Sequence, residues 1–335
     1  MIAGFQGVRK SVLAVGAIAW GCAVARQNRD YVECFCVAVL SVAMFISVIF
    51  WFLFPNISLS GGSSADMYTS LFEGHRRLTG FFAGPFHVAL GALVLLTWAM
   101  VRSARWPCAS FVVGAIGIVA GYLSLVRTFY PALALVCVVF LLVSPTLIHA
   151  ARRLAVFGAA LSVGLLLSVL FDTTGRLWWV VGSLAGASED SRFLNRIPGY
   201  WRSIELFEQS PVVGWGPGSA GDTLGAIFSS SSEHVTAHNI VLKICVEAGL
   251  AGLAAWVFLL VAILVSLRGS GARMALALCL LVALFGLGLT GSAIEALPIS
   301  FFLFLIVGLS CETTSGDRSE PRIWLSSTRR AHGGA

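Results

Sequence analysis

The sequence predicts an all-α integral membrane protein: a polytopic helical bundle of about nine transmembrane helices with one large periplasmic loop. Of its 335 residues 58% are hydrophobic and only 11% are charged. The apolar residues come in blocks of about twenty, the length that crosses a bilayer as a helix, rather than in the alternation of a barrel strand. We therefore expect a multi-pass integral membrane protein.

The apolar blocks place the expected spans in order along the chain. The first is the weakest, because it has only about fifteen apolar residues behind Arg9 and Lys10. It suits a short span, an interfacial piece or the remnant of a longer amino-terminal region, but not a cleaved signal peptide. The expected spans are 11–25, 32–54, 80–101, 107–125, 128–148, 154–171, 239–266, 273–290 and 293–309.

This pattern divides the chain into four expected regions. Residues 1–171 form the amino-terminal transmembrane helices, and residues 172–238 form the large periplasmic loop with short helices. Residues 239–310 form the carboxy-terminal transmembrane helices, and residues 311–335 form a cytoplasmic tail.

Arginines in alternate short loops predict the topology. Loops rich in arginine stay in the cytoplasm, which puts loop 55–79, the turn at 126–127, the long segment 172–238 and the turn near 291–294 outside. The net charge of +6 then reflects orientation in the lipid bilayer, and we expect no nucleic-acid partner. The inside set is Arg26, Arg29, Arg102, Arg105, Arg152, Arg153, Arg268 and Arg273, followed by the arginines of the tail.

A second set of arginines lies on the outer side, where orientation does not explain it. The chain has only two lysines, Lys10 and Lys243. A planar guanidinium that binds oxygens in pairs suits a pyrophosphate better than an ammonium does. The alternative is contact with lipid headgroups or with the acidic residues of the loop. The set is Arg76, Arg77, Arg127, Arg176, Arg192, Arg196 and Arg202.

Cysteine and acidic motifs give no sign of a metal or cofactor. None of the eight cysteines falls in the long outer loop, so we expect packing residues rather than disulfides. No spaced set of cysteine and histidine predicts zinc, and no Asp-x-Asp pair predicts the metal of a nucleotide-sugar enzyme. We therefore expect no cofactor.

The stretch "GPGSAG" at 216–221 matches the dinucleotide pattern G-x-G-x-x-G. That pattern has meaning only between a strand and a helix, and here it lies in a loop between two spans. Gly214, Gly216 and Gly218 instead indicate a tight turn with exposed amides, which could face a phosphate or merely form a bend.

Three polar residues interrupt the span that follows this loop. Asn239, Lys243 and Glu247 recur at i, i+4 and i+8 and so share one helix face, which must meet protein or water. An unpaired charge at the centre of a bilayer costs about 2.5–3.5 kcal/mol, so we expect Lys243 and Glu247 to pair. Glu247 fits a structural role, whereas Lys243 could also reach a phosphate.

Taken in order, these motifs resemble the O-antigen ligase and O-antigen polymerase superfamily. The strongest parts are "PVVGWGPGSAGDTL" and then "AHNIVLKICVEAGLAGL", in which Glu-x-Gly-x-x-Gly enters a span. Upstream, "RRLTGFFAGPFHVAL", "LVRTFYPALAL" and "SRFLNRIPGYWRSIELFEQSP" resemble the family's arginine segments. The resemblance covers about residues 76–265, although this chain has Phe86 and His87 where the family often has asparagine and has fewer spans than most members.

The resemblance implies transfer of a glycan from an undecaprenyl-diphosphate carrier to a hydroxyl acceptor, with the active site facing the periplasm. The acceptor is another glycan, a lipid A core or another hydroxyl, and polymerase and ligase activities both remain open. His238 is the expected base, with His234 second, unless His238 only caps its helix. The expected substrate ligands are Arg77, Arg127, Arg192, Arg196, Asn239 and Lys243, and the expected structural residues are Gly214, Gly216, Gly218, Glu247 and Gly249.

Two other functions compete with this one. A lipid-linked oligosaccharide flippase or another polytopic transporter would also place polar residues in spans, but the chain lacks the paired interrupted helices of an inverted repeat. A purely structural membrane protein leaves the outer arginines without a purpose. In the outer loop, "YWRSIELFEQ" at 200–209 predicts a short amphipathic helix, part of an ordered lid over the membrane surface.

Overall fold

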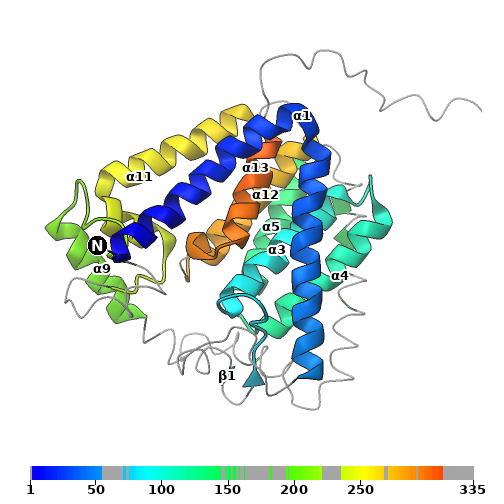
Figure 1. Cartoon of the computed structure of the whole chain (residues 1–335), viewed down its shortest axis with the longest axis horizontal. Helices are drawn as coiled ribbons and strands as arrows, with labels where there is room; N and C mark the ends of the chain where they lie inside the picture. Colours follow the sequence, from blue (N-terminus) through cyan, green and yellow to red (C-terminus); the bar gives the residue numbers. More distant parts are fainter. Residues whose placement is uncertain are drawn as a thin grey trace, which may run out of the picture.

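Apolar helices make up most of the computed structural model, and they run back and forth through one bundle (Figure 1). The structure describes residues 2–54, 71–72, 75–144, 196–220, 235–267, 271–291 and 293–311, with isolated positions between 148 and 194. The bundle helices are α1 (Ile2–Leu53), α3 (Pro85–Arg102), α4 (Pro107–Ser124), α5 (Phe129–Val143), α11 (Ile240–Ser266), α12 (Gly271–Gly288) and α13 (Ile299–Ser310).

Short elements join these helices at one end of the bundle. They are the two-residue strands β1 (Leu71–Phe72) and β2 (His75–Arg76), the helix α9 (Ile197–Gln209) and the 3-10 helix η1 (Ala293–Glu295). The strands pair antiparallel. The helix α9 confirms the short helix expected at 200–209, and it buries Ser203 and Leu206.

Five helices in the described part of the chain are long and apolar enough to cross a membrane, and two further apolar helices are shorter. The five are α1, α3, α4, α11 and α12, and the shorter two are α5 and α13. The chain is thus a multi-pass helical membrane protein. The expected number of nine spans is not shown, since the expected span 154–171 lies almost wholly outside the described residues.

Proline corrects two of the expected boundaries. The expected span 293–309 is wrong as one helix, because η1 ends at Glu295 and α13 starts only after Pro298. Proline has no amide hydrogen to donate and disfavours helical geometry in the residue before it. For a related reason α3 starts at Pro85 rather than near residue 80, since proline is favoured in the first helical turn.

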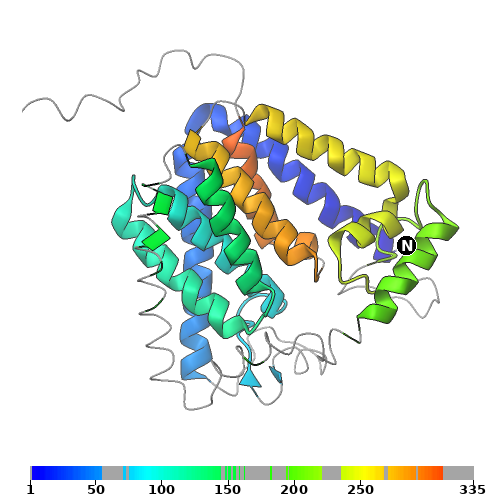
Figure 2. The ribbon, with the colours of Figure 1, turned by 180° about the vertical axis from the view of Figure 1, so that it is seen from behind.

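The helix α1 has two arms that meet at Asn28, whose φ of −150° and ψ of 47° are not helical. This bend falls between the first two expected spans, 11–25 and 32–54. The first arm packs against α13 so closely that a Cβ on Gly21 would overlap the carbonyl oxygen of Leu305. Glycine permits such close approach between membrane helices. In Figure 2, α12 lies between α5 and α13.

Ion pairs gather the arginine-rich segments at one end of the bundle, which we call the Arg102 end. There Arg102 donates to both carboxylate oxygens of Glu33, at 2.7 and 2.5 Å. Arg105 pairs with Asp30 at 2.6 Å, and the Arg29 guanidinium donates to the Cys311 carbonyl at 3.5 Å. Two described arginine segments, around Arg29 and around Arg102 and Arg105, therefore share one end, whereas Arg152, Arg153 and Arg268 lie outside the described residues. The sidedness itself stays a prediction.

The Glu33–Arg102 pair offers a test of packing at this end. The two side chains are only 2% and 9% exposed, so Glu33→Gln should leave a buried guanidinium without its counter-charge and cost about 3–5 kcal/mol. Asp30→Asn is the matched control, because the Asp30–Arg105 pair is about half exposed and is worth at most about 1 kcal/mol. Apparent melting temperatures in detergent should separate the two variants, and equal losses would contradict this assignment.

Candidate functional site

The opposite end of the bundle, which we call the His238 end, holds a break in α11. Gly249 has a φ of 61° and a ψ of −158°, so the helix stops and restarts there. The amides of Leu250 and Ala251, which an unbroken helix would bond to carbonyls four residues earlier, point elsewhere. They donate to the carbonyls of Pro211 and Val212 at 2.8 and 3.1 Å. A segment of the outer loop thus replaces part of the helix's own hydrogen bonding.

The carbonyls on the other side of the break are satisfied by the same loop. Val246 accepts from the amide of Trp215 at 2.8 Å, and Glu247 accepts through its carbonyl from the amide of Gly216 at 3.0 Å. The amide of Gly218 donates to the Glu247 carboxylate at 2.9 Å. Irregular backbone at membrane depth is tolerated only when its polar groups are bonded in this way. These amides therefore serve the bend rather than a phosphate.

Two glycines make this contact possible. A Cβ on Gly249 would lie 2.5 Å from the carbonyl carbon and oxygen of Val212, and its φ and ψ fall in a region that other residues essentially never occupy. A Cβ on Gly214, where φ is 68°, would lie 2.6 Å from the backbone of Glu247. The glycine motif of the loop and the Glu-x-Gly motif of the span therefore pack against each other. We call this contact, between residues 211–218 and residues 246–251, the loop joint of α11.

Lys243 lies in the first half of α11 and is almost completely buried, with 4% of its side chain exposed. Its ammonium donates to the carboxylate of Glu247, as the spacing predicts, to the carboxylate of Glu295 at 2.9 Å and to the carbonyl of Ala220 at 2.8 Å. An ammonium has three donors, and all three are used by protein. Lys243 could bind a substrate phosphate only by giving up one of these contacts.

Sequence reasoning missed Glu295. It lies in η1, inside the segment expected as the last span, and it is 9% exposed. A lone carboxylate in an apolar span is costly and indicates a buried partner. The acidic residue in the expected last span was therefore the sequence signal that could have identified Glu295 as a site residue. The partner could not be identified, because Lys243 is 52 residues away in the sequence.

Asn239 and His238 form the start of α11. The Asn239 side chain caps the helix by accepting from the amides of Val241 and Leu242 at 2.8 and 3.1 Å, and it donates to the carbonyl of Leu289 at 3.2 Å. His238, just before the cap, is half-buried and has a φ of 44°. Positive φ is uncommon outside glycine, and strained residues of this kind cluster at functional sites.

The described arginines of the set expected on the outer side are distributed over two parts of this end. Arg77 is 9% exposed and donates through Nε to the carbonyl of Ser124 at 3.0 Å, which brings it to the turn between α4 and α5, where half-buried Arg127 also lies. Arg196 immediately precedes α9, on the far side of the bundle from α4 (Figures 1 and 2). Arg192, like His234, lies outside the described residues.

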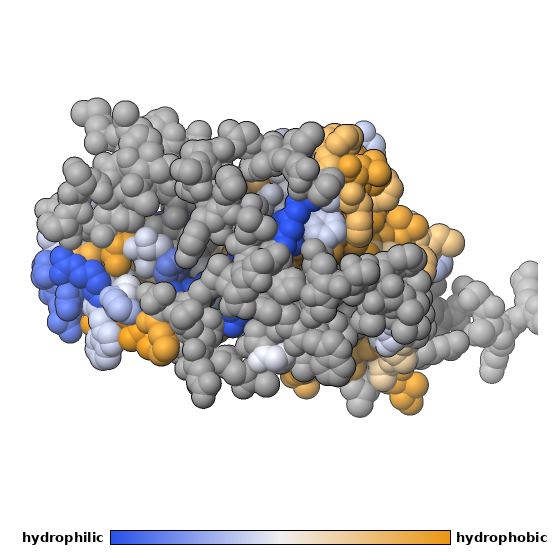
Figure 3. All heavy atoms as spheres, turned by 90° about the horizontal axis from the view of Figure 1, so that it is seen from below, coloured by the Kyte–Doolittle hydropathy of each residue, from blue (hydrophilic) through white to orange (hydrophobic). Residues whose placement is uncertain are grey.

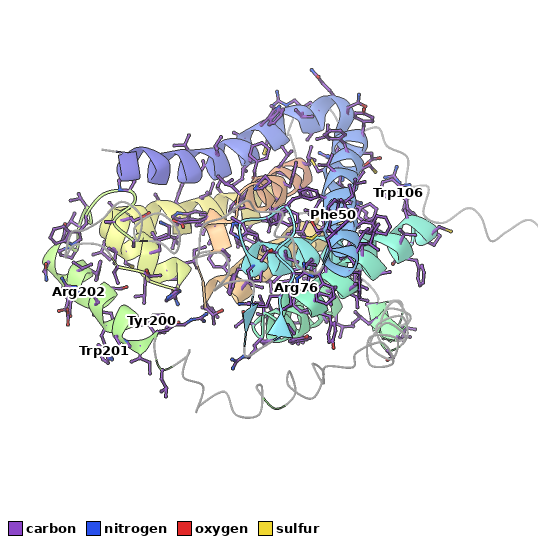
Figure 4. The ribbon with its side chains drawn as sticks, turned by 60° about the horizontal axis from the view of Figure 1, so that its bottom comes forward. Phe50, Arg76, Trp106, Tyr200, Trp201 and Arg202 are labelled. Atoms are coloured by element: carbon purple, nitrogen blue, oxygen red, sulfur yellow. The ribbon has the colours of Figure 1, made fainter. Side chains whose placement is uncertain are left out.

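Arg76 and the labelled residues of α9 show the same separation. The Arg76 guanidinium donates to the carbonyls of Trp51 and Phe54 at 2.7 and 3.1 Å and so caps the end of α1. In Figure 4, Arg76 and Phe50 both lie over the bundle helices, well apart from Tyr200, Trp201 and Arg202 on α9. Figure 3 views this end of the molecule, with hydrophilic side chains over α9 at one edge and apolar side chains at the opposite edge.

A contact chain joins the two parts. Asn239 is bonded to Leu289 at the end of α12. Two residues later, a Cβ on Gly291 would lie 2.6 Å from the ring of Phe86, which belongs to the first turn of α3. The segment that carries Arg77 leads directly into α3. The start of α11 and the start of α3 therefore both contact one segment after α12, residues 289–291 and 293–295.

Comparison with known proteins gives a family match over part of the chain. Residues 112–257 match the family model described as O-antigen ligase, which confirms the resemblance for that part of the chain. No curated protein and no solved structure matches the chain. The match supports glycan transfer of the O-antigen ligase or polymerase type, and the apolar helices make the protein a multi-pass membrane protein.

Proposed function

We propose, with the O-antigen ligase match over residues 112–257 as the premise, that this protein transfers a glycan from undecaprenyl diphosphate to a hydroxyl acceptor at the periplasmic face of the cytoplasmic membrane. The observation that carries the proposal is the His238 end itself. The matched region contains Arg127, the loop joint of α11 and His238, and this supports locating the reaction at that end.

In the proposed reaction the acceptor oxygen attacks the anomeric carbon of the donor sugar. The bond from that carbon to the pyrophosphate oxygen breaks, and undecaprenyl diphosphate leaves with the electron pair. His238 accepts the proton of the acceptor hydroxyl, which suits an imidazole at neutral pH. Fixed positive charge stabilises the leaving pyrophosphate, a role we assign to Arg77 and Arg127. Arg196 precedes α9 on the far side of the bundle from α4, so we assign it to another part of the donor or acceptor.

The structure refines the proposed roles of the other polar residues. Asn239 caps α11, so any contact with substrate would use its remaining amide hydrogen. Lys243 supports the site through its buried contacts. Gly214, Gly249 and Glu247 build the joint that holds the glycine-rich loop against α11.

Arginine geometry gives the first test of this site. Arg127→Lys keeps the charge and loses the paired hydrogen bonds, so transfer should fall by about 10–100-fold, the equivalent of one charge-assisted hydrogen bond. Arg202→Ala is the matched control, since Arg202 is exposed on α9 and paired with Glu205 at 2.9 Å. The measurement is the rate of glycan transfer in membranes. Full activity in both Arg127→Lys and Arg127→Ala would remove Arg127 from the pyrophosphate site.

A further inference from the structure

Lys243 joins three segments that are far apart in the sequence. Its ammonium reaches the next turn of α11 through Glu247, the glycine-rich loop through the carbonyl of Ala220, and η1 through Glu295. Of the two carboxylates, Glu247 already belongs to the α11 joint, where it accepts from Gly218. Glu295 is thus the group that ties this buried cluster to the segment after α12.

The start of α11 is attached to that segment at two points. The first is the hydrogen bond from Asn239 to the carbonyl of Leu289, and the second is the ion pair between Lys243 and Glu295 at 2.9 Å. One hydrogen bond leaves a helix end free to pivot, whereas two contacts a helical turn apart fix its direction. His238 precedes the first of these contacts by one residue.

The same segment also contacts the arginine side of the His238 end. Gly291 packs on the ring of Phe86 at the start of α3, and Ala293 and Ile294 are buried with it in the bundle core. Any shift of the start of α11 relative to residues 289–295 is therefore a shift of His238 relative to Arg77 and Arg127.

We propose that Glu295 is a positioning residue of this transferase: through Lys243 it sets the place of His238 and of the glycine-rich loop relative to the arginines. This inference rests on the proposed function for its consequence in catalysis, but not for its consequence in structure. Glu295 does not touch substrate, so its loss should lower kcat while the KM for donor changes by less than about twofold.

The test combines Glu295→Ala with His238→Asn in a double-mutant cycle of transfer rates. Glu295→Ala alone should lower kcat by about 10–100-fold, the scale of a misplaced reacting group. In the His238→Asn background the same change should have less than about a twofold effect, because the group that it positions is already absent. If Glu295→Ala lowered the transfer rate by the same factor in the His238→Asn background as in the wild type, the proposal would be overturned. Glu205→Ala, on the exposed face of α9, is the matched control for loss of a carboxylate.

Glu295→Gln keeps the test decisive where the alanine variant fails to fold. The amide oxygen still accepts from Lys243, and Lys243 remains paired with Glu247, so this variant should fold and show a smaller kcat loss of about threefold to tenfold. Wild-type kcat in Glu295→Gln would also overturn the proposal.

Hydrogen exchange separates this inference from the proposed function. In the purified protein, Glu295→Ala should speed exchange of the amides in residues 215–220 and 239–243 by at least about tenfold, with no change in α4. Unchanged exchange there would reject the positioning role whatever the activity. Faster exchange in Glu295→Ala, together with a wild-type protein that transfers no glycan, would retain the structural link and reject the transferase instead.

Discussion

Gly249→Ala should unfold the joint between the outer loop and α11 and strongly destabilise the protein. The backbone conformation of Gly249 costs other residues about 1–3 kcal/mol, and the new methyl group would overlap the carbonyl of Val212. Forced overpacking adds about 1–3 kcal/mol. The apparent melting temperature in detergent should fall sharply, and the yield of monodisperse protein should fall with it.

Three other glycines supply graded controls for this substitution. Gly214→Ala, on the loop side of the same contact, should behave like Gly249→Ala. Gly216 has a φ of 92° with no atom near a new Cβ, so Gly216→Ala isolates backbone strain. Gly16, in the first arm of α1, has neither strain nor a close neighbour, and Gly16→Ala should be neutral. Equal melting temperatures for all four variants would contradict the claim that Gly249 and Gly214 are required for the contact between the loop and α11.

Replacing His238 should abolish most transfer without unfolding the protein. A positioned acid–base group contributes about 10²–10⁴-fold, so His238→Ala should lower the rate by that factor. Alanine also carries a strain penalty at a φ of 44°. His238→Asn and His238→Gly avoid that penalty, because asparagine and glycine tolerate positive φ. All three variants should lose activity alike, while the melting temperatures of the last two stay at or above that of the wild type.

His238→Gln distinguishes a base from a group that only orients the acceptor. Glutamine can donate or accept a hydrogen bond but takes no proton at neutral pH. Near-wild-type activity in His238→Gln with loss in His238→Asn would assign an orienting role. Near-wild-type activity in every variant would remove His238 from the mechanism and direct attention to His234 or to an acidic residue of the loop.

Local patterns in the sequence predicted the local parts of this site. The i, i+4 spacing of Lys243 and Glu247 predicted their ion pair, and the amphipathic stretch at 200–209 predicted α9. The glycine-rich turn was expected to bend or to bind phosphate, and the structure shows the amides of Trp215, Gly216 and Gly218 bonded to α11. Helical spacing and turn chemistry depend on neighbours in the chain, so sequence reasoning reaches them.

Contacts between distant segments were beyond such patterns. The sequence did not predict that the carbonyls of Pro211 and Val212 would accept the amide hydrogen bonds of α11 just after Gly249. Glycine within a membrane helix is more often a packing residue. The partnership of Glu295 with Lys243 was equally invisible, since the expected span hid the turn before Pro298. Both features depend on how the helices pack against one another. The periodicity of a single sequence does not specify that packing.

The most direct test of the central claim is the fate of the donor in proteoliposomes that contain the purified protein. With undecaprenyl-diphosphate-linked glycan labelled in the sugar and a hydroxyl acceptor present, the label should leave the carrier and become bound to the acceptor. This transfer should be lost in His238→Asn. Label that crosses the bilayer while still attached to intact carrier, at equal rates in wild type and His238→Asn, would contradict the account and identify a flippase instead.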